Sequence, residues 1–167
     1  MFSKGGGMEK SRRTISLGFS DKKVLEGQHI CYVYSDDQER LGVMAKYLKT
    51  GMDANEKLLY LVDVMTSEEM LDHLRSLGVD FSGAKPQSFT ISEAGPAYCP
   101  SGFFKTQETL DLVRDFYLNA LDEGYAGARG TGEMSWCLGG GLAKQEDLMD
   151  YEARLNDLLL EYPYTAC

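Results

Sequence analysis

The sequence predicts an α/β domain with a mostly parallel central sheet and helices on both of its faces. From residue 28 onward, short apolar segments alternate with amphipathic segments of helical periodicity, an order typical of repeated strand–helix–strand units. Such connections are right-handed and produce parallel strands covered by helices. The composition agrees, because 43% of the 167 residues are hydrophobic and 26% are charged, as in ordinary globular domains.

The first predicted strand covers residues 29–34, a near-continuous apolar run of the kind that is buried on both faces of a parallel sheet. Cys31 inside this run is expected to be a buried free thiol in a reducing compartment. The helix that follows has apolar residues at helical spacing between 41 and 48 and is expected to end at Gly51.

The later elements continue the alternation. Thr66 and Glu69 form a capping box that opens a helix, and Gly78 is expected to close it. The other predicted elements are strands over 57–62, 88–92, 128–134 and 164–167 and helices over about 106–123 and 148–162. Because ligands bind at the carboxyl ends of parallel strands, the loops after these strands are the expected place for a site.

Composition distinguishes a tail from a folded domain, and the net charge excludes some classes of partner. Residues 1–26 begin with a polar, glycine-rich and basic stretch and are predicted to be a flexible tail and lead-in, whereas residues 27–167 are predicted to be a single α/β domain. The net charge of −9 disfavours nucleic acid and anionic membranes as partners. The chain has neither a secretory signal at its start nor a run of about 18 apolar residues, so a cytoplasmic protein is expected.

Few residues suit metal binding or catalysis. The four cysteines form no C-x-x-C pair and there are only two histidines, so no metal and no cofactor are predicted. Asp36, Asp37 and Glu39 could hold a divalent cation, but an acidic first turn of a helix is the favoured interpretation. No Ser-His-Asp order, G-x-S-x-G or H-E-x-x-H motif occurs, and Cys99 has no neighbouring base or cation to activate it.

The candidate ligand-binding residues come mostly from the ends of the predicted strands. Tyr98 and Phe103 lie in an aromatic, turn-rich loop that suits a lid over an apolar ligand or a plug for the core. Arg129 and Glu133 are expected on one face of the same strand, where they would bracket a ligand or pair with each other. The complete set of candidates is His29, Tyr34, Tyr98, Phe103, Arg129, Glu133, Trp136 and Glu152.

Three of these candidates also have a plain structural interpretation. His29 would contact a ligand or change charge near neutral pH, but at the amino end of its predicted strand it could simply begin that strand. Trp136, the only tryptophan, would line a pocket or belong to the core. Glu152 would pair with Arg129 or point into solvent from the last helix.

Two dispersed stretches resemble a known family of sensory domains. The residues that carry the likeness are His29–Tyr34, Glu39-Arg40-Leu41, Tyr47-Leu48, Gly51-Met52, Asn55-Glu56-Lys57, Tyr60, Gly124, Arg129–Trp136, Tyr151-Glu152 and Leu155-Asn156. Together they resemble the MEDS domain, named for methanogen and methylotroph proteins and the dichloromethane regulator, over about residues 28–167. In that family the last strand usually continues as Cys-x-Tyr-Asp, so the sequence is expected to be a piece of a longer chain.

This resemblance implies a signal-input domain of a signal-transduction or transcription-regulatory protein. Its partners would be a small organic ligand, for example a halogenated or methylated one-carbon compound, and an output region such as a histidine kinase or a DNA-binding domain. Ligand would favour one packing of the loops around residues 98–104 and 136. A homodimer is compatible with this function, although the sequence does not show an interface.

A second resemblance concerns the scaffold. Leu25–His29 and Gly51–Tyr60 are similar to the corresponding parts of RecA-like ATPases of the circadian-clock KaiC type. A P-loop needs G-x-x-x-x-G-K-[ST], but the turn after the first predicted strand is Tyr34-Ser35-Asp36-Asp37-Gln38-Glu39-Arg40. It has no glycine, no lysine and three carboxylates, which would repel a triphosphate. The expected fold is therefore RecA-like without a functional P-loop.

Three function hypotheses follow from these observations. The preferred one is a non-catalytic small-molecule sensory domain with its ligand at the carboxyl ends of the strands. The alternatives are a divergent RecA-like nucleotide-binding enzyme and a protein–protein interaction module. Stabilisation by ATP would favour the enzyme, and the lack of a usable pocket would favour the interaction module.

Overall fold

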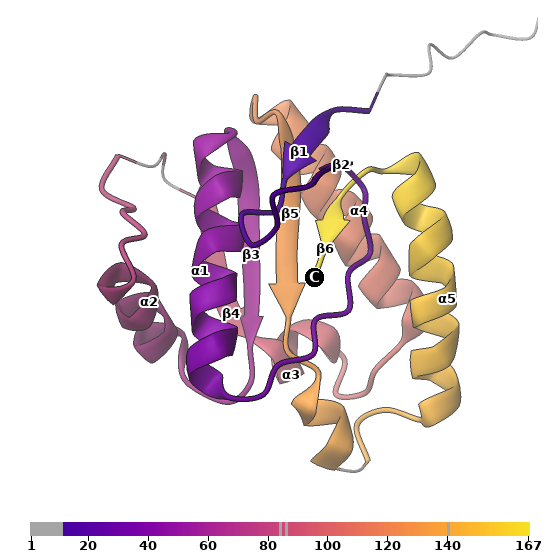
Figure 1. Cartoon of the computed structure of the whole chain (residues 1–167). Helices are drawn as coiled ribbons and strands as arrows, with labels where there is room; N and C mark the ends of the chain where they lie inside the picture. The colour runs from indigo at the N-terminus through magenta and orange to yellow at the C-terminus, as the bar shows by residue number, and fades with distance from the viewer. Residues whose placement is uncertain (1–11, 84, 86, 140) are drawn as a thin grey trace, which may run out of the picture.

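The central sheet has four parallel strands in the order β4-β3-β5-β6. A computed structural model describes residues 12–83, 85, 87–139 and 141–167. The strands are β3 (Glu56–Val62), β4 (Phe89–Glu93), β5 (Gly127–Gly132) and β6 (Thr165–Ala166). Their carboxyl ends point to the bottom of Figure 1. The predicted α/β class and parallel sheet are confirmed, while the RecA-like assignment stays a prediction.

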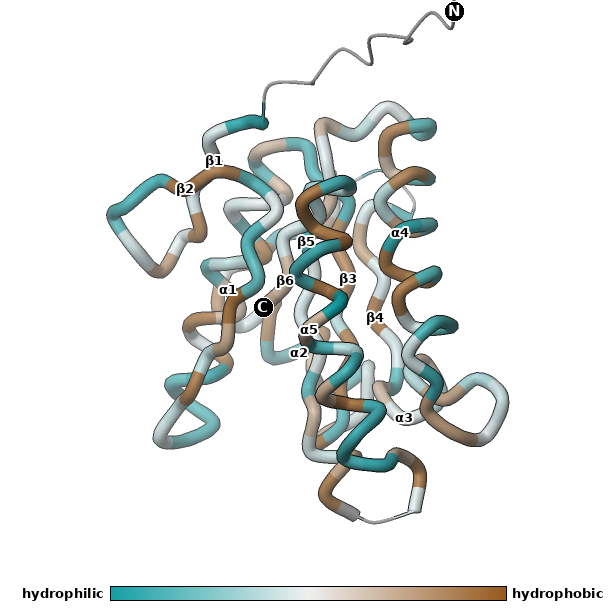
Figure 2. Tube along the Cα trace, turned by 90° about the vertical axis from the view of Figure 1, so that its right-hand side faces the viewer, coloured by the Kyte–Doolittle hydropathy of each residue, from teal (hydrophilic) through white to brown (hydrophobic). Residues whose placement is uncertain are grey.

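Helices cover both faces of this sheet. One face carries α1 (Asp37–Asp53) and α2 (Ser67–Ser76), and the other carries α3 (Ala94–Tyr98), α4 (Thr106–Asp122) and α5 (Gln145–Glu161). Figure 2 views the sheet from its edge, with α1 and α4 on opposite sides of the strands. None of the helices in the described part of the chain combines the length and the apolarity needed to cross a membrane.

The two faces of β3 supply the two halves of the hydrophobic core. Leu58 and Tyr60 pack with α1 and α2, whereas Leu59 and Leu61 pack with α4 and α5. Every residue of β3 is buried, as expected for the interior strand of a parallel sheet. Burying each of these large apolar side chains stabilises the fold by about 1.5–3 kcal/mol.

The helix starts follow the sequence signals, but one predicted stop is wrong. Thr66 and Glu69 form the predicted capping box of α2. Helix α1 continues past Gly51 and ends at Asp53. A Cβ atom at Gly51 would lie 2.6 Å from Cδ of Arg129, so this glycine allows a side chain to pack against the helix instead of ending it.

Residues 12–26 pack on the domain, although the sequence grouped them with a flexible tail and lead-in. They contain a two-stranded antiparallel hairpin of β1 (Thr14–Ser16) and β2 (Lys23–Leu25). Ile15 and Leu17 of this segment are buried in the same core as α1. The rest of the predicted tail, residues 1–11, lies outside the described residues.

The prediction of a buried first strand over residues 29–34 is wrong. His29 forms a single parallel bridge with Ala166, and residues 31–34 pair with no strand among the described residues. Cys31, predicted to be a buried thiol, is exposed, and the side chain of Val33 is 83% exposed. An apolar run does form an extended segment here, but a strand needs a neighbour to pair with, and among the described residues this segment makes only the bridge from His29 to Ala166.

Candidate functional site

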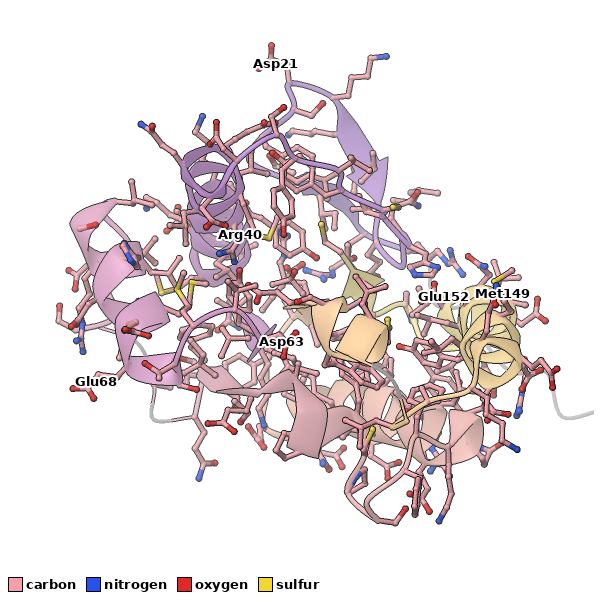
Figure 3. The ribbon with its side chains drawn as sticks, turned by 90° about the horizontal axis from the view of Figure 1, so that it is seen from below. Asp21, Arg40, Asp63, Glu68, Met149 and Glu152 are labelled. Carbon is pink, nitrogen blue, oxygen red and sulfur yellow. The ribbon has the colours of Figure 1, made fainter. Side chains whose placement is uncertain are left out.

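A cavity of about 320 Å³ lies at the carboxyl ends of β3 and β5, between the extended segment 29–34 and helices α1, α4 and α5. Figure 3 looks onto this end of the sheet. The cavity extends through the layer of the sheet, because Met44 and Tyr60 line it on the α1 face while Val113 and Leu155 line it on the α4–α5 face. It therefore stands where the parallel sheet predicts a ligand site.

The wall on the α1 face is built around the carboxylate of Glu133, which follows β5. Its Oε1 accepts hydrogen bonds from the Arg40 guanidinium and from the Tyr60 hydroxyl at 3.0 Å. Its Oε2 accepts from the amides of Asp63 at 2.7 Å and Val64 at 2.9 Å. Burial, followed by the charge of Glu133, raises the pKa of Tyr60 above its usual range. Four donors hold this carboxylate, so it is a fixed polar group on the wall of the cavity.

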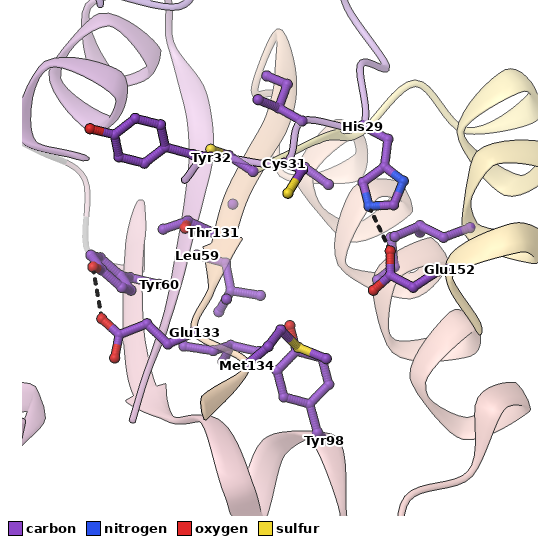
Figure 4. A pocket seen from close by; sticks show the side chains of 18 of the residues that line it. His29, Cys31, Tyr32, Leu59, Tyr60, Tyr98, Thr131, Glu133, Met134 and Glu152 are labelled. Atoms are coloured by element: carbon purple, nitrogen blue, oxygen red, sulfur yellow. Dashed lines mark hydrogen bonds and ion pairs between the residues drawn. The ribbon is translucent and has the colours of Figure 1, made fainter. Parts of the chain in front are cut away.

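A second polar group closes the opposite side of the cavity. His29 Nε2 lies 3.2 Å from Glu152 Oε2 of α5, and His29 Nδ1 lies 3.1 Å from Asn156 Oδ1. The hydrogen bond with Glu152 raises the pKa of His29 against the opposing effect of burial. This contact joins the extended segment 29–34 to α5, and Figure 4 shows it facing the Tyr60–Glu133 pair across the cavity.

Aromatic side chains form the apolar base between these polar groups. Tyr98 from α3 and Tyr151 from α5 line the cavity, and burial raises the pKa of Tyr98 above its usual range, so its hydroxyl stays protonated. Trp136 lies in the 3₁₀ helix η1 (Ser135–Gly139) and stacks on Tyr98 with ring centroids 5.2 Å apart. A change in the position of Tyr98 would therefore reach the single tryptophan of the chain.

Five of the eight predicted candidates line the cavity and three do not. The lining candidates are His29, Tyr34, Tyr98, Glu133 and Glu152. Phe103 is 65% exposed and Trp136 is buried in the core, and neither is among the residues that line the cavity. That the five lining residues bind a ligand stays a prediction.

Arg129 is also outside the cavity, and its predicted pairing with Glu133 or Glu152 is wrong. Its side chain lies on the same face of the sheet as that of Glu133 but turns toward the amino end. There its Nε donates to Glu56, and its Nη1 donates to the carbonyls of Ser16 at 3.1 Å and Tyr47 at 3.0 Å. The side chain is completely buried, so Arg129 joins parts of the fold and does not line the cavity.

Sequence reasoning missed Arg40 and Tyr60 as cavity residues. Arg40 precedes Met44 by four positions and Tyr47 by seven, so an arginine on the apolar stripe of α1 was a signal that could have found it. Tyr60 alternates with Leu58 and so faces the same side of the sheet. Nothing in the sequence pairs Arg40 or Tyr60 with Glu133.

The acidic turn before α1 is occupied by its own hydrogen bonds. Asp36 accepts from the amide of Glu39 at 2.9 Å, and Glu39 accepts from the amide of Ser35 and the hydroxyl of Tyr32, each at 2.9 Å. The bond from the Ser35 amide is the main reason that the pKa of Glu39 is lowered. Carboxylates thus take amides that a P-loop would offer to phosphate. In the described ranges, no cluster of three or more histidine, cysteine, aspartate or glutamate residues is arranged to hold a metal ion.

Comparison with known proteins identifies one family. A family described as MEDS, the MEthanogen/methylotroph, DcmR Sensory domain, has a model that matches residues 28–167. No curated protein matches the chain. The matched range contains the whole four-stranded sheet and every residue that lines the cavity, but it leaves out the β1–β2 hairpin.

Proposed function

The chain belongs to the MEDS family of sensory domains, and on this premise we propose that it is a non-catalytic signal-input domain that binds a small organic molecule in the cavity at the carboxyl ends of β3 and β5. The cavity is the observation that carries this proposal. Its interior is apolar and aromatic, and fixed polar groups lie on two sides of it. This combination is typical of small-molecule sites.

The charged side chains that line the cavity favour some classes of ligand over others. Glu133 is neutralised by Arg40 on one side, and Glu152 is paired with His29 on the other. An anionic ligand would meet both carboxylates, so a neutral or weakly polar organic compound fits better. Halogenated and methylated one-carbon compounds, which the family resemblance suggests, belong to the set to test first.

The turn before α1 argues against the nucleotide-binding alternative. Its amides are hydrogen-bonded to Asp36 and Glu39, and these carboxylates would repel a triphosphate. Binding of ATP would require this turn to give up its own bonds. We therefore do not favour a RecA-like enzyme, even if the scaffold is related.

The contacts of the cavity suggest how binding becomes a signal. A ligand in the cavity would touch the segment 29–34 and helix α5 together, and these are joined across the opening by the contacts of His29 with Glu152 and Asn156. Ligand would favour the packing in which both surfaces fit it. An attached output region, a histidine kinase or a DNA-binding domain in the cytoplasm, would respond to that change in population.

A thermal-shift screen tests this function. It would include halogenated and methylated small molecules, methylated amines and thiols, and ATP with magnesium, with Trp136 fluorescence as a second readout. A compound at about 100 times its Kd should stabilise the domain by about 2.7 kcal/mol and raise the Tm by about 5–10 °C. A shift with ATP, or no shift with any organic compound, would contradict the proposal.

Two matched variants locate the binding site. Cys31→Phe places a bulky side chain at a position that lines the cavity and is exposed, so it should block ligand without disturbing the core. Val33→Phe makes a similar change two residues away, at an exposed position outside the cavity lining. The ligand-induced shift should disappear in the first variant and remain in the second.

A further inference from the structure

The strand β4 forms an outer edge of the sheet, on the opposite side from β6. Its inner side is paired in parallel with β3, where the amide of Leu58 donates to the Ser88 carbonyl at 2.8 Å. Backbone groups alternate in direction along a strand, so the amide and carbonyl of Thr90 also point toward β3. The amides and carbonyls of Phe89 and Ile91 therefore point outward, away from the sheet.

These outward groups are unpaired within the described part of the chain. The amides and carbonyls of Phe89 and Ile91 make no backbone hydrogen bond to a described loop or helix, and no described strand lies along this side of β4. Every residue of β3 is buried, whereas the residues of β4 are half-buried or exposed. An unpaired row of amides and carbonyls is a template for a further strand.

The sequence of this edge is almost a palindrome. Residues 88–92 read Ser-Phe-Thr-Ile-Ser, so polar and apolar side chains alternate in the same order from either end. These five residues include no charged residue and no proline, which are common devices for blocking an edge strand. An antiparallel strand of the same sequence would therefore present a matching side chain at every position.

We propose that β4 is the interface of a two-fold symmetric homodimer, in which it pairs antiparallel with β4 of a second copy and joins the two sheets into one. The match of the strand to itself identifies the occupant, because a two-fold interface uses the same surface on both copies. Thr90 would face its own equivalent across the axis, and Phe89 would face Ile91 in both halves. The inference does not involve the cavity, so it is independent of the proposed ligand function.

The backbone of β4 selects this register. In an antiparallel pair, facing residues alternate between pairs that exchange both backbone hydrogen bonds and pairs that exchange none. Phe89 and Ile91 of opposite copies would exchange both, and Thr90 would occupy the position that needs none. A shift by one residue would set outward groups against inward groups. A shift by two would set the charged side chain of Glu93 opposite Phe89.

The side chains on both faces of β4 fit the same register. Phe89 and Ile91 pack on the face that carries α1 and α2, and the ring of Phe89 stacks on Phe81 with centroids 4.9 Å apart. Phe89 of one copy would meet Ile91 of the other on this face, and Thr90 would meet its equivalent on the opposite face. Aromatic–β-branched pairs and threonine pairs are among the favourable cross-strand contacts.

The dimer should be weak and should depend on salt. A pair of strands of 5 residues each is at the low end of the size range of protein interfaces, and each copy carries a net charge of −9. We therefore expect a Kd of about 10–500 µM. This Kd should fall at least about threefold between about 0.05 M and about 0.5 M salt, because salt screens the repulsion between the two copies.

Sedimentation equilibrium of the whole chain, from about 5 µM to about 1 mM, tests the inference. The mass should double over this range. Thr90→Lys and Thr90→Glu should each raise the Kd at least about tenfold, because like charges would face each other across the axis. An equimolar mixture of the two variants should associate again. Thr14→Lys makes the same change at an exposed position of the β1–β2 hairpin and should leave the Kd unchanged.

Hydrogen exchange at the two ends of this concentration range identifies the strand that pairs. The amides of Phe89 and Ile91 should exchange at least about tenfold more slowly in the dimer. The amide of Thr90 provides an internal control, because it points toward β3 in the monomer and in the dimer alike, and its exchange should not change.

A monomer at every concentration and salt would overturn the inference. A dimer that resists Thr90→Lys and leaves Phe89 and Ile91 unprotected would also overturn it, because another surface would then join the copies. A mixture of Thr90→Lys and Thr90→Glu that stays monomeric would remove Thr90 from the axis and reject this register. A mass that grows beyond the dimer would reject a closed two-fold pair.

Discussion

Two buried arginine–glutamate pairs lie on the same face of the sheet, at its opposite ends. Arg129 pairs with Glu56 at the amino end, and Arg40 pairs with Glu133 at the carboxyl end. Both arginines are at most 2% exposed. The first pair is enclosed by α1 and the β1–β2 hairpin, whereas the second borders the cavity. Burial of an ion pair therefore does not by itself indicate a binding site. What distinguishes the two pairs is whether a cavity lies beside them.

The largest expected effect comes from breaking the enclosed pair. Arg129→Met should lower the free energy of unfolding by about 3–5 kcal/mol, because it leaves Glu56 buried with Arg13 as its remaining ionic partner. The surface arginine Arg114 provides the control, and Arg114→Met should change stability far less, because its ion pairs with Asp111 and Asp115 are at the surface. Urea unfolding measures both. Equal losses in the two variants would contradict a structural role for Arg129.

A smaller loss is expected at the pair beside the cavity. Glu133→Gln keeps the shape and one acceptor oxygen but replaces an oxygen that accepts hydrogen bonds with an NH2 group. It should cost about 1–3 kcal/mol, less than Arg129→Met. Because Glu133 lines the cavity, the same variant should change the Kd of any compound found in the ligand screen. An unchanged Kd would remove Glu133 from the proposed site.

A glycine tests how the strand β5 shapes the cavity. A Cβ atom at Gly132 would collide with the hydroxyl end of Tyr98, so Gly132→Ala should displace Tyr98 and cost about 1–2 kcal/mol. The fluorescence of Trp136 should change as well, because it stacks on Tyr98. At Gly42 in α1 an added Cβ meets no atom within 4 Å, and Gly42→Ala should stabilise the domain by about 0.5–1 kcal/mol. Unaltered fluorescence in Gly132→Ala would show that Tyr98 does not move.

Local signals predicted most of the fold, whereas contacts between distant residues were out of reach. The capping box at Thr66 and the strand over residues 57–62 depend on neighbours in the sequence, and both were predicted correctly. The prediction of a strand over residues 29–34 was wrong because an apolar run shows only that a segment can be buried. Whether the segment pairs as a strand depends on its contact with Ala166, more than 130 positions away.

In the candidate site, too, local signals were predictive and long-range contacts were not. Strand-end position correctly placed Glu133 near the cavity. The shared face of the strand also suggested Arg129, whose long side chain turns toward Glu56 at the other end of the sheet. Arg40 was missed because its partner is 93 positions away. The direction in which a buried arginine turns is decided by where its acceptors lie after folding, and the sequence alone does not state this.

The smallest expected effect is a pH dependence at the contact that joins segment 29–34 to α5. Glu152 raises the pKa of His29 in the folded state, so this contact stabilises the fold below about pH 6.5, the ordinary histidine value, and loses that contribution as pH rises through the raised value. His29→Gln should therefore lower stability more at pH 5.5 than at pH 8.5, by less than about 1 kcal/mol because Glu152 is partly exposed.

Nuclear magnetic resonance titration of the His29 ring checks the cause of this dependence. The pKa should lie above 6.5 in the native chain and fall in Glu152→Gln, because the hydrogen bond with the carboxylate is its largest favourable influence. The pH dependence of stability should weaken in the same variant. A pKa that does not change in Glu152→Gln would assign the shift to Asn156 instead, and α5 would then be joined to segment 29–34 by a contact that pH does not control.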